Sequence, residues 1–157
     1  MATTLTIGNI SIAPGEVKRG GIPIGGDLFR ATREIPIIVY RGAEDGPCLW
    51  LNGGTHGDEP EGALSIFKAL HTLDPQKLRG TVVGVPAMNV AGFTAGKRGD
   101  PLDSFTYDMN RVYPGSAEGY PTERVAWAHW EAMKECCDLQ IAIHSGGEHS
   151  YLAHMIF

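Results

Sequence analysis

The sequence predicts an α/β fold in which a mixed, mainly parallel sheet is flanked by helices. Short apolar runs rich in Val and Ile alternate along the chain with longer stretches whose apolar residues recur at helical spacing. An order of strand, helix, strand, helix and strand is typical of layered α/β proteins. With 157 residues the chain has the length of one domain, so we expect a single unit over residues 1–157.

The first half of the chain is expected to supply three strand segments and one helix. Residues 5–12 alternate around a Gly-Asn pair, which indicates an edge hairpin. Further strands are expected at residues 34–40 and, after a turn at 42–47, at residues 48–52. Residues 60–73 carry apolar side chains at helical spacing, and the acidic residues near the start of this segment suit the positive end of a helix dipole.

The second half contains the least regular stretch of the sequence. A β-branched run at residues 80–86 predicts a buried strand. Residues 89–119 are rich in glycine and polar residues without clear periodicity, and so long a stretch in a compact domain is usually functional. Residues 122–137 are expected to form a helix, and residues 139–143 and 151–157 two more strands.

Charge and composition argue against several classes of partner. The net charge is −5 and the few basic residues do not cluster, which disfavours nucleic-acid binding. No apolar run approaches the ~20 residues that span a bilayer, and the N-terminus lacks the pattern of a signal peptide.

The three cysteines, Cys48, Cys136 and Cys137, are a poor disulfide framework because their number is odd and two are adjacent. We interpret them as reduced thiols of a cytoplasmic protein. The adjacent pair is expected to be buried on a helix rather than to bind metal, because it lacks the usual ligand spacing.

The motif Gly-Gly-Thr-His-Gly-Asp-Glu at residues 53–59 places an imidazole and a carboxylate three residues apart, where a strand passes into a helix. Side chains at the C-terminal end of a strand lie where open α/β sheets bind ligands. The glycines allow a sharp turn, and Glu59 would point back toward His56. The alternative is a tight turn in which His56 caps the helix and Glu59 is a solvated acid.

His144 offers a third ligand, because it follows the apolar run at residues 139–143 and precedes Ser-Gly-Gly. Two histidines and one carboxylate, with a fourth position open to water, form a typical catalytic zinc site. The alternative is a histidine that serves the core or a turn, and His149 is a weaker substitute as ligand. The remaining histidines are expected to be structural or on the surface: His154 in the last strand, and His71 and His129 in helices.

Asn110 and Arg111 give a third signal, within the sequence Asp-Met-Asn-Arg-Val-Tyr-Pro-Gly at residues 108–115. An amide beside a guanidinium suits the recognition of a substrate carboxylate. The alternative is a loop arginine that pairs with Asp108 or Asp103.

These three motifs, in this order, resemble the succinylglutamate desuccinylase/aspartoacylase family, a branch of the zinc carboxypeptidase-like enzymes. The likeness runs from His56 to Gly147, and the first 50 residues are similar to the family only loosely. It implies a zinc-peptidase-like fold of the phosphorylase/hydrolase type. It also implies a zinc-dependent hydrolase that cleaves the amide bond of an N-acyl amino acid or a similar small carboxylate.

The resemblance further implies roles for single residues. The ligands of one zinc ion per chain would be His56, Glu59 and His144. Asn110 and Arg111 would grip the substrate carboxylate, while the zinc ion would activate a water molecule and polarise the scissile carbonyl. A basic residue upstream of the Asn-Arg pair helps to polarise that carbonyl in the family, and Arg98 is the candidate here.

The sequence departs from the family pattern in two ways. Ala142 stands where the family usually has an aspartate, and losing such an outer carboxylate commonly costs ~10–100-fold in affinity or activity. The general-base glutamate of the family lies well after the third ligand, so we expect it beyond Phe157. The fold is therefore expected to be incomplete at the C-terminus, as the N-terminal part of a longer protein.

Two other functions remain as alternatives. These departures favour a zinc- or ligand-binding domain without catalysis. The nearest alternative among hydrolases is a carboxypeptidase-type peptidase that acts on peptides. In addition, an unpaired sheet edge at residues 151–157 would invite formation of a homo-oligomer.

Overall fold

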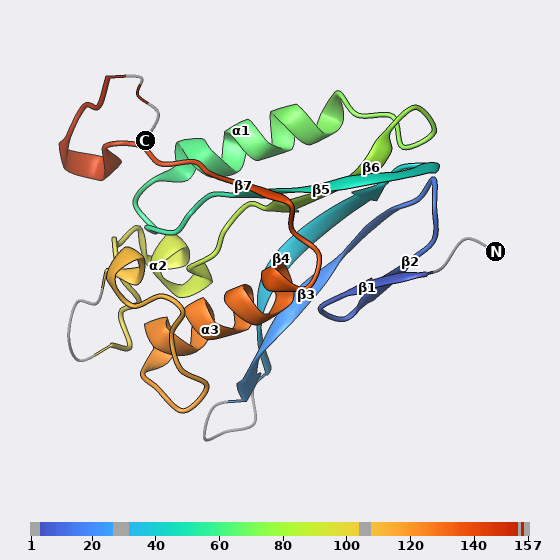
Figure 1. The fold of residues 1–157 in the computed structure, drawn as a ribbon. Helices are drawn as coiled ribbons and strands as arrows, with labels where there is room; N and C mark the ends of the chain where they lie inside the picture. Colours follow the sequence, from blue (N-terminus) through green and yellow to red (C-terminus); the bar gives the residue numbers. More distant parts are fainter. Residues whose placement is uncertain (1–3, 27–31, 104–107, 154, 156–157) are drawn as a thin grey trace.

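The computed structural model describes residues 4–26, 32–103, 108–153 and 155, and its main feature is a five-stranded mixed sheet (Figure 1). The strand order is β3-β4-β6-β5-β7. β3 (Val17–Gly26) is antiparallel to β4 (Thr32–Arg41), which is antiparallel to β6 (Arg79–Val85). β5 (Glu44–Asn52) is parallel to both β6 and β7 (Leu139–Ala142). The predicted mixed sheet is confirmed, but only two of its four described strand pairings, those of β5 with β6 and with β7, are parallel, where mainly parallel pairing was expected.

The two faces of the sheet are covered by different helices (Figure 1). α1 (Pro60–His71) packs on β5 and β6, and its Ile66 and Leu70 are buried there. α3 (Pro121–Lys134) packs on β3. Side chains alternate between the two faces of a strand, so Trp50 belongs to the core under α3 and its neighbour Leu51 to the core under α1.

A small antiparallel hairpin completes the larger core. It is formed by β1 (Leu5–Ile7) and β2 (Ile10–Ile12), as expected for residues 5–12. Its isoleucines are buried against β3, where a Cβ atom on Gly20 would lie 2.6 Å from a side-chain carbon of Ile10. In the described ranges no helix is long and apolar enough to cross a membrane.

Several predicted elements need correction. β3 was not expected, and the turn predicted at residues 42–47 is shorter because β5 already begins at Glu44. The irregular stretch at residues 89–119 contains α2 (Val90–Ala95) and the 3₁₀ turn η1 (Met109–Arg111).

The C-terminal elements differ most from the prediction. The strand expected at residues 139–143 is β7, which ends at Ala142 and is an edge strand whose four residues are all exposed. Residues 151–153 and 155 are not in a strand, and residues 154, 156 and 157 lie outside the described residues. α3 ends at Lys134, so Cys136 and Cys137 follow the helix and are only half-buried.

Candidate metal centre

Two parallel strands bring both candidate histidines to the same end of the sheet, where these strands finish. Asn52 ends β5 and pairs with Ala142, which ends β7. Because parallel strands run in the same direction, the loops that follow them leave the sheet side by side, and these loops carry His56 and His144. The structure thus brings together residues that are far apart in the sequence.

A close backbone contact shapes the loop that carries His56. The amide of Gly57 donates to the carbonyl of Arg98 at 3.3 Å. A Cβ atom on Gly57 would lie 2.0 Å from the carbonyl carbon of Gly92 in α2, so a side chain does not fit here. The loop then passes directly into α1, and Glu59 is the residue before its first turn.

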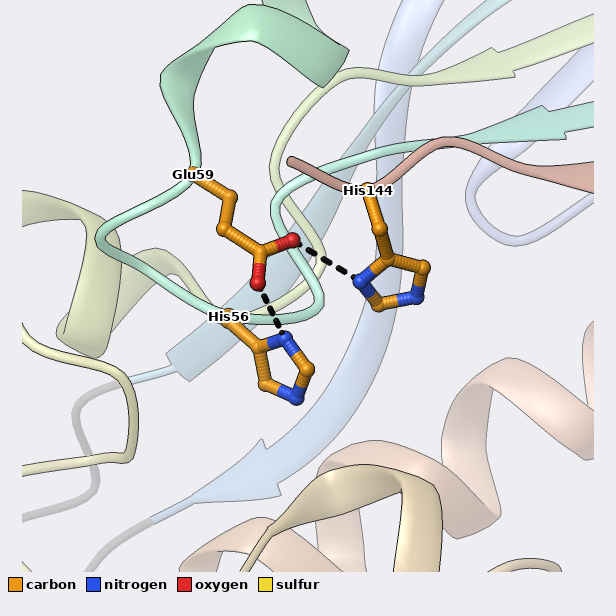
Figure 2. Close-up of side chains that lie close together, drawn as sticks. All are labelled: His56, Glu59 and His144. Carbon is orange, nitrogen blue, oxygen red and sulfur yellow. Dashed lines mark hydrogen bonds and ion pairs between the residues drawn. The ribbon is translucent and has the colours of Figure 1, made fainter. Parts of the chain in front are cut away.

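His56, Glu59 and His144 converge on one point, as Figure 2 shows. Nδ1 of His56 lies 2.7 Å from Oε1 of Glu59, and Nδ1 of His144 lies 2.8 Å from Oε2 of the same carboxylate. The backbone amide of Ser145 also donates to Oε2 of Glu59, at 3.0 Å. His56 and Glu59 are buried, whereas His144 is exposed.

The geometry of these three side chains fits a zinc ion. Their donor atoms all lie within 4.8 Å of one another. Zinc binds imidazole nitrogen and carboxylate oxygen at about 2.0–2.2 Å in tetrahedral sites, which require donors spaced on the order of 3–4 Å. His56 and Glu59 lie on the buried side of the cluster, and His144 lies on its exposed side.

Asp108 forms an outer contact that sequence reasoning did not assign to the site. Its Oδ1 lies 3.0 Å from Nε2 of His56, and its Oδ2 accepts a hydrogen bond from Nη2 of Arg98 at 2.9 Å. Metal-binding histidines almost always donate their second ring nitrogen to such a partner, which fixes the orientation of the ring. The signal in the sequence is the carboxylate that opens the motif with Asn110 and Arg111.

The ring of His56 therefore lies between two carboxylates. Burial opposes a charge on this ring, but its hydrogen bonds to Glu59 and Asp108 raise the pKa of His56 above the usual value. A metal ion bound at Nδ1 would replace one ring proton and leave Nε2–H to donate to Asp108.

Both carboxylates of the cluster are ionised at neutral pH. Burial opposes a charge on Glu59, but hydrogen bonds from His144 and His56 lower its pKa to about 2. Partial burial also opposes a charge on Asp108, but hydrogen bonds from His56 and Arg98 hold its pKa well below the usual range. Ionised carboxylates are the form that binds metal ions.

The residues expected to contact substrate lie next to this cluster. Asn110 and Arg111 are exposed in η1, and Nδ2 of Asn110 is 3.4 Å from Nε2 of His56. Arg98 has a half-exposed side chain, and its Nη1 is 3.5 Å from Oε1 of Glu59. The carboxylate that was considered as a partner of Arg111, Asp108, contacts Arg98 and His56 instead.

The other histidines are not part of the described cluster. His71 is exposed, and its Nδ1 is 2.7 Å from the carbonyl oxygen of Phe67 in α1. His129 is fully buried in the core between Trp50 and Tyr113. The side chain of His149 and all of His154 lie outside the described part of the structure.

Comparison with known proteins identifies the family of the chain. The family model of the succinylglutamate desuccinylase/aspartoacylase catalytic domain matches residues 45–156. The chain belongs to this family. It is 37% identical over 113 residues to the N-α-acetyl-L-2,4-diaminobutyric acid deacetylase of Halomonas elongata. The matched residues make up 72% of this chain and 32% of the deacetylase.

Solved structures of this family and beyond it share the fold. The product-bound ectoine utilization protein EutE (DoeB) from Ruegeria pomeroyi matches with a TM-score of 0.77 and 28% identity, over 92% of this chain and 43% of that protein. A metallo-carboxypeptidase from Burkholderia cenocepacia has the same fold at 19% identity, with a TM-score of 0.61 over 84% of this chain and 37% of that protein. This family member therefore spans less than half the length of these relatives.

Proposed function

We propose that this chain provides the zinc-binding and carboxylate-binding part of an amidohydrolase that removes the acyl group from an N-acyl amino acid. The observation that carries the proposal is the convergence of three ligand-type side chains, His56, Glu59 and His144, at the edge where parallel strands end. Membership of a family of deacylases supports the reaction class.

The proposed ligands would hold one zinc ion from the buried side of the cluster. A zinc ion bound there supplies Lewis-acid polarisation of the amide carbonyl and lowers the pKa of a water molecule. Asp108 would keep the ring of His56 in the orientation that ligation needs, and the amide of Ser145 would do the same for the carboxylate of Glu59.

Three polar side chains around the cluster are assigned to the substrate. Asn110 and Arg111 are exposed beside His56, which suits binding of the amino-acid carboxylate by an amide and a planar guanidinium. Arg98 is half-exposed beside Glu59, and we assign its guanidinium to the carbonyl oxygen of the scissile amide. A fixed positive charge at that oxygen stabilises the negative charge that develops there during hydrolysis.

A metal-binding domain without turnover is the second candidate function. It is favoured by Ala142, which places a methyl group where the family usually has an aspartate. A peptidase of the carboxypeptidase type is less well supported, because the likeness to the Burkholderia protein concerns the fold alone.

Elemental analysis of the purified chain tests the metal site. We expect close to one zinc ion per chain, loss of the metal in His56→Ala and in His144→Ala, and full retention in His71→Ala, whose side chain is exposed on α1. Equal loss of zinc in His71→Ala would refute the ligand assignment.

A deacylase assay then separates the two candidate functions. The zinc-loaded chain is incubated with N-acetyl-L-2,4-diaminobutyrate, beside the full-length Halomonas deacetylase as a positive control. Release of acetate that depends on Arg98 and Arg111 supports the amidohydrolase, whereas bound zinc without turnover supports the second candidate.

A cytoplasmic location, expected from the thiols, belongs to the same proposal and is tested by cell fractionation.

A further inference from the structure

A chain of hydrogen bonds connects the buried part of the central sheet with the loop that carries Asn110 and Arg111. Nε1 of Trp50, in β5, donates to Nε2 of His129, in α3, at 2.9 Å. On the other side of the same ring, Nδ1 of His129 lies 2.8 Å from the hydroxyl oxygen of Tyr113. Trp50 and His129 are fully buried, so the contact between them is shielded from water, whereas Tyr113 is 37% exposed and its contact with His129 is partly buried.

The direction of this chain follows from its donors. An indole N–H can only donate, so Nε2 of His129 is the acceptor and the ring proton is on Nδ1. Nδ1–H then donates to the hydroxyl oxygen of Tyr113, whose own hydrogen points toward Sδ of Met88 at 4.0 Å. Burial lowers the pKa of His129 to about 4, so the ring is neutral and keeps this arrangement at physiological pH.

The hydroxyl of Tyr113 anchors the loop on one side of Asn110 and Arg111. Met109, whose side chain is buried in the core at the start of η1, anchors it on the other side. Between the two anchors, Asn110 and Arg111 are exposed. The loop also carries Asp108, which contacts His56. A displacement of this loop would therefore move the substrate side chains and the partner of a metal ligand together.

We propose that Tyr113 and His129 are positioning residues, which hold the turn from Asp108 to Arg111 in the place where it serves the site. The functional part of this inference rests on the proposed function, whereas the positioning itself is a property of the fold. Neither residue is assigned contact with substrate or metal.

Hydrogen exchange of backbone amides tests the positioning directly. Two amides report on the loop: Arg111, which donates to the carbonyl of Asp108, and Gly115, which donates to the carbonyl of Val112. In Tyr113→Phe, which removes only the hydroxyl, we expect both amides to exchange about three- to tenfold faster, the factor that the loss of one hydrogen bond produces. Amides of β4 and β6 should keep their rates.

Tyr40→Phe is the matched control, because Tyr40 packs against the core cluster under α1. It should leave the exchange of Arg111 and Gly115 unchanged. Equal exchange rates in Tyr113→Phe and the wild-type protein would overturn the inference, as would the same acceleration in the control variant.

A pair of substitutions at His129 separates positioning from packing. In His129→Gln the amide oxygen can accept from Trp50 and the amide nitrogen can donate to Tyr113, so the direction of the chain is preserved. In His129→Leu both bonds are lost. We expect slow exchange at Arg111 to be retained largely in the glutamine variant and lost in the leucine variant. Equal acceleration in the two variants would show that only packing matters and would contradict the inference.

The effect on the site is measured by the affinity of the zinc-loaded chain for N-acetyl-L-2,4-diaminobutyrate. Tyr113→Phe should weaken this binding about three- to tenfold and leave the zinc content unchanged. If the wild-type chain binds neither zinc nor this probe, the proposed function fails, while the exchange rates alone still support or overturn the positioning roles.

Discussion

Asp108 shows how one carboxylate can serve both sides of the site. It is shared between the ring of His56 and the guanidinium of Arg98, so it connects a proposed metal ligand with a proposed substrate residue. The position has a further consequence for Ala142. Ala142 offers no carboxylate near His144, but His56 has Asp108 as a carboxylate partner. We therefore expect the site still to bind a metal ion.

The first prediction at the scale of residues concerns Asp108→Asn. The amide keeps the size of the side chain but accepts a weaker hydrogen bond from His56, so we expect zinc affinity to fall about 10–100-fold, as is usual for outer partners of metal ligands. Competition with a chromophoric chelator measures this affinity. Asp45→Asn is the control, since the side chain of Asp45 is fully exposed. Unchanged zinc affinity in Asp108→Asn would contradict the role of this carboxylate.

The second prediction concerns pH and His129. Burial lowers the pKa of His129 in the folded chain to about 4, whereas the usual value in an unfolded chain is ~6.5. Between pH ~6.5 and pH 4 the unfolded chain therefore takes up a proton that the folded chain does not. The contribution of this residue to stability is therefore complete above pH ~6.5 and declines as the pH falls toward 4, by up to about 3 kcal/mol.

Urea unfolding at pH 7.5 and at pH 4.5 measures this effect. His129→Gln, which cannot take up the proton, should lose less stability than the wild-type protein between these two pH values. His71→Gln removes an exposed histidine and should behave as the wild-type protein does. An equal loss of stability in His129→Gln and the wild-type protein would contradict the prediction.

Local spacing explains which of the site residues could be found in the sequence. His56 and Glu59 are three residues apart in a glycine-rich turn, and His144 directly follows an apolar run, so a metal cluster could be predicted before its geometry was seen. The roles of Asp108 and His129 could not be predicted in this way. Asp108 contacts His56, which is 52 residues away, and His129 contacts Trp50, which is 79 residues away, so only the folded chain brings these partners together.

At the scale of elements, the contact between the His56 loop and α2 determines where the site is built. The backbone of Gly57 is pressed against Gly92 in α2, so the substitution Gly57→Ala must push the loop and the helix apart. We expect a loss of stability of about 1–3 kcal/mol, which is typical of overpacking, and weaker zinc binding because His56 is the adjacent residue. Thermal unfolding and zinc titration measure the two effects. An unchanged melting temperature would contradict the close contact.

The unexpected strand β3 shows where sequence patterns fail at this scale. Its sequence, Val-Lys-Arg-Gly-Gly-Ile-Pro-Ile-Gly-Gly, contains residues that are depleted in strands. Pairing with β4 forms this strand nonetheless, and Gly20 and Gly21 leave the space that Ile10 and Glu34 occupy. Tertiary contacts thus override propensity here. The strongly patterned strands β4 and β6, and residues 48–52 of β5, had no such conflict and could be predicted.

At the scale of the whole molecule, the two edges of the sheet differ, because other elements pack against one edge strand and leave the other exposed. β3 lies at one edge, where the β1–β2 hairpin and α3 pack against it. β7 lies at the other edge, and its Leu139 and Ile141 are 59% and 45% exposed. The expectation of an unpaired edge at residues 151–157 was thus placed on the wrong segment, because the described residues there are not in a strand. The edge that does present apolar side chains is β7.

This edge leads to the last prediction, that the chain associates through β7. An exposed edge strand offers unpaired backbone groups, and proteins often protect such strands with charged side chains, which the sequence Leu-Gln-Ile-Ala lacks. We expect the sedimentation coefficient of the chain to rise with concentration. Ile141→Lys should suppress this rise, since a lysine on an edge strand disfavours pairing with another strand. Leu102→Lys removes an even more exposed apolar side chain far from β7 in the sequence and should leave the association unchanged. If the chain sediments as a monomer at every concentration, or if both lysine variants act alike, the association does not occur through this edge.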